Sequence, residues 1–471
     1  MSERAEQIRR HFDALSSDAD RSRRRNRHYH REQTHYFRNL ITENKRVLEL
    51  GCGSGELLNA LKPSRGIGID ISPGMVRLAR DKYPHLTFHV GDGNHLDQIP
   101  RETYDYIILS DFVGYLDDIQ ACLEGLHPFC GPHTRLIISY YNFLWEPVLR
   151  LAEILRLKTP TPEHSWLTPD DMRNLMSLAD YQVVKTERRL LFPVYIPVVS
   201  WLLNHLGTLP VINKACLCHY TVARPTPRHA KNDLSVSIVI PCRNEKGNVE
   251  PAIQRLARFG THQEIIFVDG HSTDGTPEEI RRVQAHYADR DIKLLVQDHT
   301  GKGDAVRKGF QEAKGDVLMI LDADLTVPPE DLPKFYRAIV SGKAEFLNGC
   351  RLVYPMEGEA MRTLNLIANK LFAMTFTWLL GERLKDTLCG TKVMFREDYL
   401  TLVRNRTYFG DFDPFGDFDL LFGASKMNLK IIEVPVRYRN RQYGETKIHR
   451  FRHGLLLLRM VIYAYRKLKS A

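Results

Sequence analysis

Short apolar runs alternate with longer stretches of helical periodicity along most of the chain. Runs that resemble strands occur in both halves, at residues 46–50, 66–70, 86–90, 104–109, 236–240, 264–268 and 318–321. An apolar run of this length, bounded by turn residues, is typical of a buried strand. Strands that alternate with helices are typical of parallel sheets, whose ligands bind where the strands end. The pattern therefore predicts an α/β fold in each half.

A polar segment that contains several prolines separates the two sets of strands. Residues 222–233 lack the apolar periodicity of the segments on either side, which is typical of a linker. We therefore expect a first domain at 1–224, a linker at 225–235 and a second domain at 236–471. The length of 471 residues agrees with two large α/β domains or with about three of average size.

Composition excludes some classes of protein. The 43% hydrophobic content is enough for packed cores. The eight cysteines, of which only Cys216 and Cys218 lie close together, match neither a zinc motif nor a disulfide framework. The N-terminus is charged and no apolar run reaches the roughly 20 residues of a membrane span. We therefore expect a cytoplasmic location, with peripheral contact at the membrane.

The basic residues allow several partners. The net charge of +9 is compatible with nucleic acid, anionic lipid or phosphorylated substrates. Residues 1–40 are predicted to be helical, and the run Arg21–Arg27 is interpreted as a solvated helix face. Recruitment of RNA by this run is the alternative.

Two carboxylates follow the apolar run at 318–321. Asp322 and Asp324 are two residues apart, so they point the same way while the chain stays extended. Oxygen ligands of this kind suit Mg²⁺ or Mn²⁺, which take further ligands from substrate phosphates. The sequence predicts a metal site here, and a charged turn is the alternative.

The first strand of the chain leads into a glycine-rich turn, RVLELGCGSG at 46–55. Glycine lets a ligand approach the backbone closely, and a following helix N-terminus offers N–H groups. Asp70 ends the next strand about twenty residues further on, where nucleotide-binding folds place a carboxylate for ribose hydroxyls. The NAD-binding pattern G-x-G-x-x-G is not matched, because Leu57 and Leu58 follow Gly55.

Roughly residues 25–225 resemble the class I S-adenosylmethionine-dependent methyltransferases. The motifs that carry this resemblance are VLELGCGSG in the glycine-rich turn, GIDIS at 68–72 and GDGNHL at 91–96. The resemblance implies a Rossmann-like fold that binds S-adenosyl-L-methionine. The cofactor-binding residues that it implies are Glu49, Gly51 and Gly53 for the methionine part, Asp70 for the ribose, Asp92 and Gly93 beside the adenine, and Ile71 and Ser110.

The methyl acceptor is not readable from the sequence. The fourth strand is followed by Ser110-Asp-Phe-Val-Gly-Tyr115, not by the Asn/Asp-Pro-Pro-Tyr of amino-methylating nucleic-acid enzymes, so no nucleic acid is expected. His164 is a candidate general base, and a capping role is the alternative. The apolar stretch Leu190–Leu203 carries Pro193 and Pro197 and is interpreted as a lid or an interfacial surface.

The second half resembles glycosyltransferase family 2, which has the GT-A fold, and most closely its dolichyl-phosphate and polyprenyl-phosphate sugar transferases. The motifs that carry the resemblance are PCRNE at 241–245, VDGHSTDGT at 268–276, GKGDAVRKG at 301–309, LDADLTVPPEDLP at 321–333, NGCR at 348–351, DTLCGTK at 386–392 and RNRQYGETK at 439–447.

This resemblance implies a nucleotide-sugar donor, a UDP- or GDP-sugar, and a lipid-phosphate acceptor. The residues implied for the nucleotide sugar are Pro241, Glu245 and Asp269, with Asp322 and Asp324 on the metal and Lys302, Arg351, Arg441 and Lys447 facing phosphates. Two departures leave details open. Gly270 stands where many relatives have a second acid, and Thr326 stands where some have glutamine.

The acceptor decides which groups are catalytic. A lipid phosphate is already an anion, so cations such as Arg351, Arg441 and Lys447 would matter more than a base. A hydroxyl acceptor requires a carboxylate base. Asp386 is the best candidate, and Asp417 and Asp419 are the alternatives.

Two apolar helices bear on membrane contact. Leu364–Leu380 is interrupted by polar residues, and Leu455–Ile462 is flanked by Arg and Lys. A basic helix with an apolar face can lie at a lipid interface, and burial against the domain is the alternative. The leading hypothesis is a bifunctional methyltransferase and inverting glycosyltransferase that acts on a lipid-linked acceptor. The alternative is transfer to a sugar hydroxyl in polysaccharide or glycolipid assembly, with a first half that methylates the same glycan or only binds its cofactor.

Overall fold

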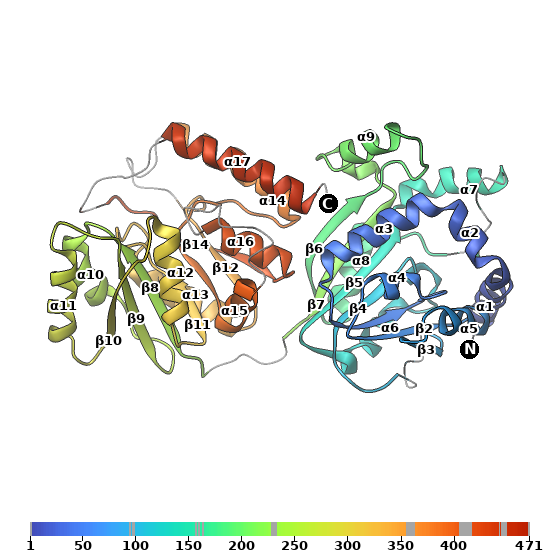
Figure 1. The fold of residues 1–471 in the computed structure, drawn as a ribbon, viewed down its shortest axis with the longest axis horizontal. Helices are drawn as coiled ribbons and strands as arrows, with labels where there is room; N and C mark the ends of the chain where they lie inside the picture. Colours follow the sequence, from blue (N-terminus) through green and yellow to red (C-terminus); the bar gives the residue numbers. More distant parts are fainter. Residues whose placement is uncertain are drawn as a thin grey trace. The chain divides into compact units, whose positions relative to one another are not determined.

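The computed structural model contains two compact units, Met1–Thr226 with Lys469–Ala471, and Pro227–Leu468 (Figure 1). The structure describes residues 2–93, 96, 99–155, 158, 161–162, 164–227, 233–354, 363–404, 417–441, 443 and 450–469, without the side chains of 22, 363–368, 417 and 450–457. Residues 228–232 of the expected linker, and Asn94 and His95 of the third motif, lie outside this set.

The first unit is built on a seven-stranded sheet in the order β3-β2-β1-β4-β5-β7-β6. The first five strands are parallel, and β7 is antiparallel to both β5 and β6. The order reverses between β1 and β4, which places a ligand crevice at their carboxyl ends. The strands are β1 Arg46–Leu50, β2 Arg65–Asp70, β3 Thr87–Val90, β4 Tyr104–Ser110, β5 Cys130–Tyr141, β6 Tyr181–Arg189 and β7 Cys218–Pro225.

Helices cover both faces of this sheet. One apolar cluster joins α3 and α5 to one face through residues such as Phe37 and Val76, and another joins α6 and α8 to the opposite face. The helical N-terminal region is confirmed. The helices are α1 Glu3–Leu15, α2 Ala19–Arg25, α3 Arg27–Leu40, α4 Glu56–Ala60, α5 Pro73–Lys82, α6 Ile119–Gly125, α7 Glu146–Ile154, α8 Pro169–Leu178 and α9 Val199–Leu206.

Local sequence explains where several of these helices begin. Ser72 caps α5, where its side chain accepts a hydrogen bond from the Met75 N–H, and Pro73 occupies the first turn. Thr168 and Asp171 form a reciprocal capping box at the start of α8. These caps fix the helix ends that follow β2 and precede β6.

The second unit has a seven-stranded sheet in the order β10-β9-β8-β11-β13-β12-β14. Only β13 runs antiparallel to its neighbours, β11 and β12. The strands are β8 Val236–Cys242, β9 Gln263–Asp269, β10 Asp291–Val296, β11 Val317–Ile320, β12 Phe346–Cys350, β13 Lys392–Phe395 and β14 Ile431–Pro435. The α/β class expected for both halves is confirmed.

Two apolar clusters lie on opposite faces of the second sheet. The first contains α10, α11 and α13, and the second contains α12 and α14 to α17 (Figure 1). The helices are α10 Lys246–Arg255, α11 Thr276–His286, α12 Lys302–Glu312, α13 Leu332–Val340, α14 Thr363–Leu380, α15 Arg396–Arg404, α16 Asp417–Lys426 and α17 Arg450–Leu468.

Helices α14 and α17 each have a buried side and an exposed apolar side. Phe376 and Met460 are buried in the core, whereas Met374 and Ile462 are 71% and 48% exposed. Both helices therefore combine burial against the domain with exposed apolar side chains. Among the described residues, none of the helices has the length and apolar character to cross a membrane.

Candidate functional site

The turn after β1 exposes its backbone at a glycine. Gly51, Gly53 and Gly55 have φ angles of 70°, 51° and 81°, which side chains disfavour. A Cβ added at Gly53 would meet nothing within 4 Å, whereas one added at Gly51 would lie 2.5 Å from the Phe112 ring. The turn is thus packed on one side and open at Gly53, as a ligand cradle requires.

Asp70 fixes this turn to the end of β2. Its carboxylate accepts hydrogen bonds from the Gly53 N–H at 2.8 Å and the Ser72 N–H at 2.9 Å. Burial raises the pKa of Asp70, and these two bonds oppose the shift. Each carboxylate oxygen can accept more than one bond, so the contacts leave capacity for ligand hydroxyls. Ile71 follows, partly buried.

Glu49 is the most unusual carboxyl group at this edge. It is 2% exposed, and its Oε2 has no hydrogen-bond partner among the described residues. Burial, and then the charges of Glu56 and Asp70, raise the pKa of Glu49 to about 8. A buried carboxyl group with one oxygen unpaired suits a cationic ligand, which would favour the ionised form.

The pKa of Glu49 predicts a dependence of stability on pH. Because the folded pKa is raised, the folded chain holds a proton between about pH 4.5 and pH 8 that the unfolded chain has lost, so the stability falls as the pH rises through this window. Glu49→Gln is expected to remove this loss, which amounts to a few kcal/mol. Urea unfolding at pH 5 and pH 8 measures it, with the exposed Glu124→Gln as the control. Parallel pH profiles for wild type and Glu49→Gln would contradict the assignment.

The Phe112 ring packs against both the glycine-rich turn after β1 and Gly93 of the motif at 91–96. An added Cβ at Gly93 would collide with this ring, as it would at Gly51, so the two glycine turns close on one side chain. Asp92, in the same loop, is partly buried. The structure therefore brings Gly51 and Gly93 together.

A hydrogen-bonded group at the end of β4 was not among the residues predicted from sequence. The Asp111 carboxylate accepts from the Tyr29 hydroxyl, from Gln33 Nε2 at 2.7 Å and from Ser139 Oγ at 2.9 Å. Burial raises the pKa of Asp111, and these bonds oppose the shift. Ser110, which was predicted, lies beside it with its Oγ 3.3 Å from that of Ser139. The sequence feature that could have indicated this group is the i, i+4 spacing of Tyr29 and Gln33, which places both side chains on one face of α3.

Aromatic rings surround His164 near this group. The His164 ring centroid lies 5.5 Å from that of Tyr115, 6.3 Å from Tyr141 and 4.6 Å from Trp166. Its Nδ1 lies 3.3 Å from the Pro162 carbonyl, and its buried Nε2 has no partner among the described residues. Burial lowers the pKa of His164. A neutral imidazole of this kind can accept a proton.

In the second unit, the two acids after β11 are each paired with a cation. Asp322 Oδ1 lies 2.7 Å from Lys302 Nζ, and Asp324 Oδ2 lies 2.6 Å from Arg441 Nη2. Arg441 Nη1 also lies 3.5 Å from Glu245 Oε1, so Arg441 links two of the predicted acids. The structure thus gathers residues from four sequence motifs at one sheet edge.

The pKa of Asp322 reflects these cations. Burial acts to raise it, but the charges of Lys302, Lys392 and Arg351 outweigh burial and lower it. Lys392 was quoted within a motif but not predicted as a site residue. It is 1% exposed and donates to the Cys389 carbonyl. Asp322 is therefore ionised and surrounded by cationic side chains.

Asp269 ends β9, and Thr326 lies in the segment that follows β11. Asp269 is 2% exposed; its Oδ2 accepts from the Ser272 N–H at 3.1 Å, and its Oδ1 has no partner among the described residues. Thr326 donates to Asp324 Oδ1 through its N–H at 3.1 Å and its Oγ1 at 2.8 Å, so it orients that carboxylate. Pro241, near the end of β8, is partly buried.

Arg351 and Asp386, predicted to act separately, form one buried ion pair. Arg351 Nε and Nη2 lie 2.7 and 2.8 Å from the two oxygens of Asp386, and the Arg351 N–H and Asn369 Nδ2 add bonds at 3.0 and 3.1 Å. Burial opposes ionisation, but Arg351 lowers the pKa of Asp386 to about 2. A carboxylate held this way is a weak base, and its guanidinium partner is committed to it. The pair instead fixes the position of β12 against the 386–392 loop.

Breaking this pair is expected to destabilise the second unit. Arg351→Ala leaves Asp386 buried without its partner, which should cost about 3–5 kcal/mol of unfolding free energy. The control is Arg281→Ala, because the Arg281 side chain is 62% exposed in a helix of the same unit. Urea unfolding of the full chain measures both variants. Equal midpoints for Arg351→Ala and wild type would show that the pair does not hold the loop.

Three predicted residues remain, Lys447, Asp417 and Asp419. Lys447 lies outside the described residues, as does the side chain of Asp417. Asp419 is 7% exposed within α16. No group of three or more His, Cys, Asp or Glu side chains is arranged to hold a metal within the part of the chain that the structure describes.

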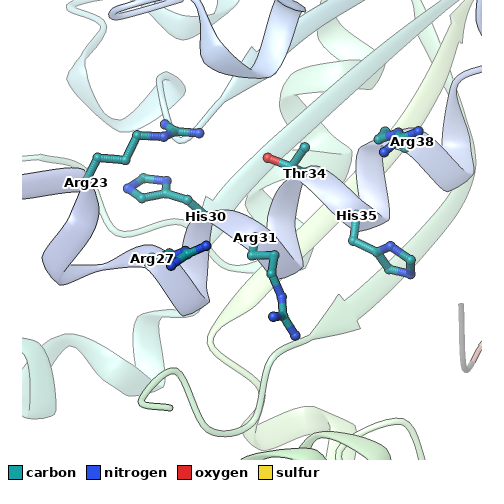
Figure 2. A pocket seen from close by; sticks show the side chains of 7 residues that line it. All are labelled: Arg23, Arg27, His30, Arg31, Thr34, His35 and Arg38. Atoms are coloured by element: carbon teal, nitrogen blue, oxygen red, sulfur yellow. The ribbon is translucent and has the colours of Figure 1, made fainter. Parts of the chain in front are cut away.

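A basic groove of about 300 Å³ runs along α2 and α3 of the first unit (Figure 2). Burial lowers the pKa of His30 to about 4, so the His30 ring adds no positive charge to the groove at neutral pH. Arg23 lies 3.7 Å from Glu56 and Arg38 lies 3.7 Å from Glu43. The lining residues are Arg23, Arg27, His30, Arg31, Thr34, His35 and Arg38.

Two family models match the chain, one in each half. Residues 21–186 match a methyltransferase domain, and residues 237–406 match glycosyl transferase family 2. A solved magnesium protoporphyrin IX methyltransferase from Synechocystis aligns with 46% of this chain and 98% of its own, at 18% identity and a TM-score of 0.34. This last similarity is too low to carry a conclusion.

The curated relatives match the second half. A dolichol-phosphate mannosyltransferase from Pyrococcus furiosus is 29% identical over 241 residues, 50% of this chain and 64% of the relative. An undecaprenyl-phosphate 4-deoxy-4-formamido-L-arabinose transferase from Aeromonas hydrophila is 26% identical over 239 residues, 48% of this chain and 65% of the relative. The chain thus spans slightly less than two thirds of the length of these relatives.

Proposed function

We propose that this chain, which joins a methyltransferase domain of Rossmann-like fold to a family 2 glycosyltransferase domain of GT-A fold, is a bifunctional enzyme. One half transfers a sugar from a nucleotide sugar to a polyprenyl-phosphate-type lipid, with inversion, and the other transfers a methyl group from S-adenosyl-L-methionine. The observation that carries the sugar-transfer proposal is the gathering of Glu245, Lys302, Asp322, Asp324 and Arg441 at one sheet edge.

The donor is proposed to bind across the ends of β8, β9 and β11. Asp269, with an oxygen that has no partner among the described residues, and Glu245 take the nucleoside. Asp322 and Asp324 are oxygen donors suited to Mg²⁺ or Mn²⁺, and they fit such an ion because the remaining ligands come from the diphosphate and water. When bound, the ion neutralises charge on the leaving nucleoside diphosphate.

The cations now paired with these acids have a second role in the proposal. Lys302 and Arg441 sit within 2.7 Å of the acids, so they can turn from carboxylate to phosphate oxygen over a short distance. Fixed cations beside a leaving diphosphate lower the barrier most in a site with little water. Lys447 belongs to the same motif as Arg441, and its proposed contact with phosphate rests on the family resemblance of that motif alone.

A lipid phosphate is the favoured acceptor because the best candidate base is committed elsewhere. Asp386 keeps a pKa near 2 under its bonds to Arg351, so it would not take a proton from a hydroxyl. A phosphate acceptor is already an anion and needs no such base. The names of the two curated relatives agree with this choice. Transfer to a sugar hydroxyl remains the second candidate, with Asp417 or Asp419 as base.

The first half is proposed to hold S-adenosyl-L-methionine at the turn after β1. The residues fit this cofactor: Gly53 faces open space, Glu49 Oε2 has no partner among the described residues, and Asp70 has acceptor capacity beside them. Bound there, the cofactor supplies a methyl group on a positively charged sulfur. Asp92 and Gly93 border the base, and Ile71 and Ser110 line the same edge. A domain that binds the cofactor without turnover is the alternative.

The methyl acceptor is proposed to enter near Asp111 and His164. These groups lie at the end of β4 and beside the rings of Tyr115 and Tyr141. His164 can remove a proton from the acceptor, and the surrounding rings exclude water from the reaction.

The sugar-transfer proposal is tested with the purified full chain, Mn²⁺ and a panel of UDP- and GDP-sugars, each offered polyprenyl phosphate or a free oligosaccharide. Sugar recovered only in the lipid phase supports the lipid-phosphate acceptor. Sugar recovered in the oligosaccharide would replace it with the hydroxyl acceptor, and no transfer from any donor would contradict both.

A further inference from the structure

Exposed large hydrophobic side chains are concentrated in two segments of the first unit. Among the described residues, 28 such side chains are exposed, of which six lie in 143–155 and eleven in 194–212. Val198 and Val211 are 73% and 74% exposed, and Trp201 is 62% exposed. Scattered exposed apolar residues are ordinary, but a concentration of this kind indicates a binding surface.

The helices of these segments face outward. The structure describes all of α7, and none of its residues is buried. In α9 the one buried residue is Ser200, while Trp201 and Leu202 beside it are 62% and 49% exposed. An amphipathic helix on a soluble domain normally shows the opposite pattern. Within the described residues, Val148 and Leu151 of α7 and Trp201 and Leu202 of α9 are therefore exposed apolar side chains, while Leu149 of α7 packs against the core.

Hydrogen bonds connect the two segments into one surface. Trp145, just before α7, donates from Nε1 to the Ala215 carbonyl at 2.7 Å, and Asn142 Nδ2 donates to the Lys214 carbonyl at 2.9 Å. Residues 214 and 215 follow the apolar stretch that contains α9. Helices α7 and α9 lie along the same edge of the first unit in Figure 1.

The basic groove borders this surface. Asn204 on α9 lies 3.4 Å from His28 Nε2 on α3, and the Tyr195 ring lies 5.6 Å from the His28 ring. Arg27 and Arg31 are exposed on the same helix and line the groove (Figure 2). Aliphatic side chains, a Trp and a Tyr thus adjoin exposed guanidinium groups.

We propose that this face, defined by residues 143–155 and 194–212 with Arg27 and Arg31, docks the first unit on an anionic lipid bilayer. Aliphatic and Trp side chains enter the headgroup region, and arginines bind lipid phosphates beside them. RNA would match the arginines but would leave the aliphatic side chains exposed to water. The proposal does not depend on the proposed sugar or methyl transfer.

The test is sedimentation of the full chain with phosphatidylcholine vesicles, with and without phosphatidylglycerol. Wild type is expected to bind the vesicles that contain phosphatidylglycerol. The double variant Trp201→Glu/Leu202→Glu should lower partitioning at least about tenfold, because it replaces inserting side chains with charge. Arg27→Glu/Arg31→Glu should remove the preference for phosphatidylglycerol. Unchanged binding by either variant would overturn the proposal.

Matched controls come from α8 of the same unit. Leu178 is 54% exposed and the Arg173 side chain 60%, so Leu178→Glu and Arg173→Glu change the same chemistry away from the surface and should bind as wild type does. Equal melting temperatures show that all variants fold. If wild type binds a single-stranded RNA through Arg27 and Arg31 and does not sediment with vesicles, RNA replaces lipid as the partner. Sugar transfer to a short-chain, water-soluble acceptor should be unchanged in the α9 variant.

Discussion

Asp322→Asn is expected to slow sugar transfer about a hundred- to a thousandfold while leaving S-adenosyl-L-methionine binding intact. Asp322 is the acid nearest to Lys302, and its charge is assigned to the metal on the donor diphosphate. The Asn amide has nearly the same shape as the Asp322 carboxylate but carries no charge. The metal and Lys302 would therefore both lose the negative charge that Asp322 supplies. Removing one electrostatic stabiliser of a transition state lowers turnover about a hundred- to a thousandfold. The measurement is the initial rate of sugar transfer at saturating Mn²⁺.

The matched control is Asp316→Asn, at the opposite end of the same strand. Asp316 accepts hydrogen bonds from the Ser235 N–H at 2.9 Å and Oγ at 2.7 Å, so the change affects local structure but not the proposed site. It is expected to retain most of the activity. An Asp322→Asn enzyme with a normal rate would remove Asp322 from the metal site.

Asp70→Ala is expected to lower the affinity for S-adenosyl-L-methionine at least about a hundredfold. The change removes a charged acceptor for the ribose hydroxyls, and each hydrogen bond to a charged group contributes about 1.5–3 kcal/mol. It also frees the Gly53 and Ser72 N–H groups that Asp70 now holds, so the turn after β1 loses its anchor. Isothermal calorimetry on the full chain measures the affinity.

Asp81→Ala serves as the control for this variant because Asp81 is exposed at the end of α5, the helix that follows Asp70 and Ser72. It should bind the cofactor as wild type does. Asn in place of Asp70 should fall between Ala and wild type. Full affinity in Asp70→Ala would mean that the ribose is held elsewhere.

The sequence was sufficient for seven of the fourteen strands of the described residues, β1 to β4, β8, β9 and β11, and for residues adjacent to their ends. Apolar runs identified every parallel strand that carries a candidate acid, because a buried strand needs continuous apolar character. Asp70, Asp269 and Asp322 follow from this, since a residue just after a parallel strand lies at the binding edge whatever the loops do.

Pairings between distant residues were not predictable in the same way. Arg351 and Asp386 are 35 positions apart and each matched a motif, but only the fold shows that they bind each other. The group of Tyr29, Gln33 and Asp111 depends on where α3 packs against β4. The apolar surface of α7 and α9 was suggested by Leu190–Leu203, yet the contribution of 143–155 required the hydrogen bond between Trp145 and Ala215.

One measurement tests most directly whether the chain holds two independent transferase centres. Wild type, Asp322→Asn and Asp70→Ala are each incubated with Mn²⁺, a sugar-labelled nucleotide sugar, methyl-labelled S-adenosyl-L-methionine, polyprenyl phosphate and a cell extract as the source of methyl acceptor, and both labels are counted in the products. Wild type should transfer both labels, Asp322→Asn only methyl, and Asp70→Ala only sugar. Loss of both labels in either variant, or of neither, would contradict two separate centres.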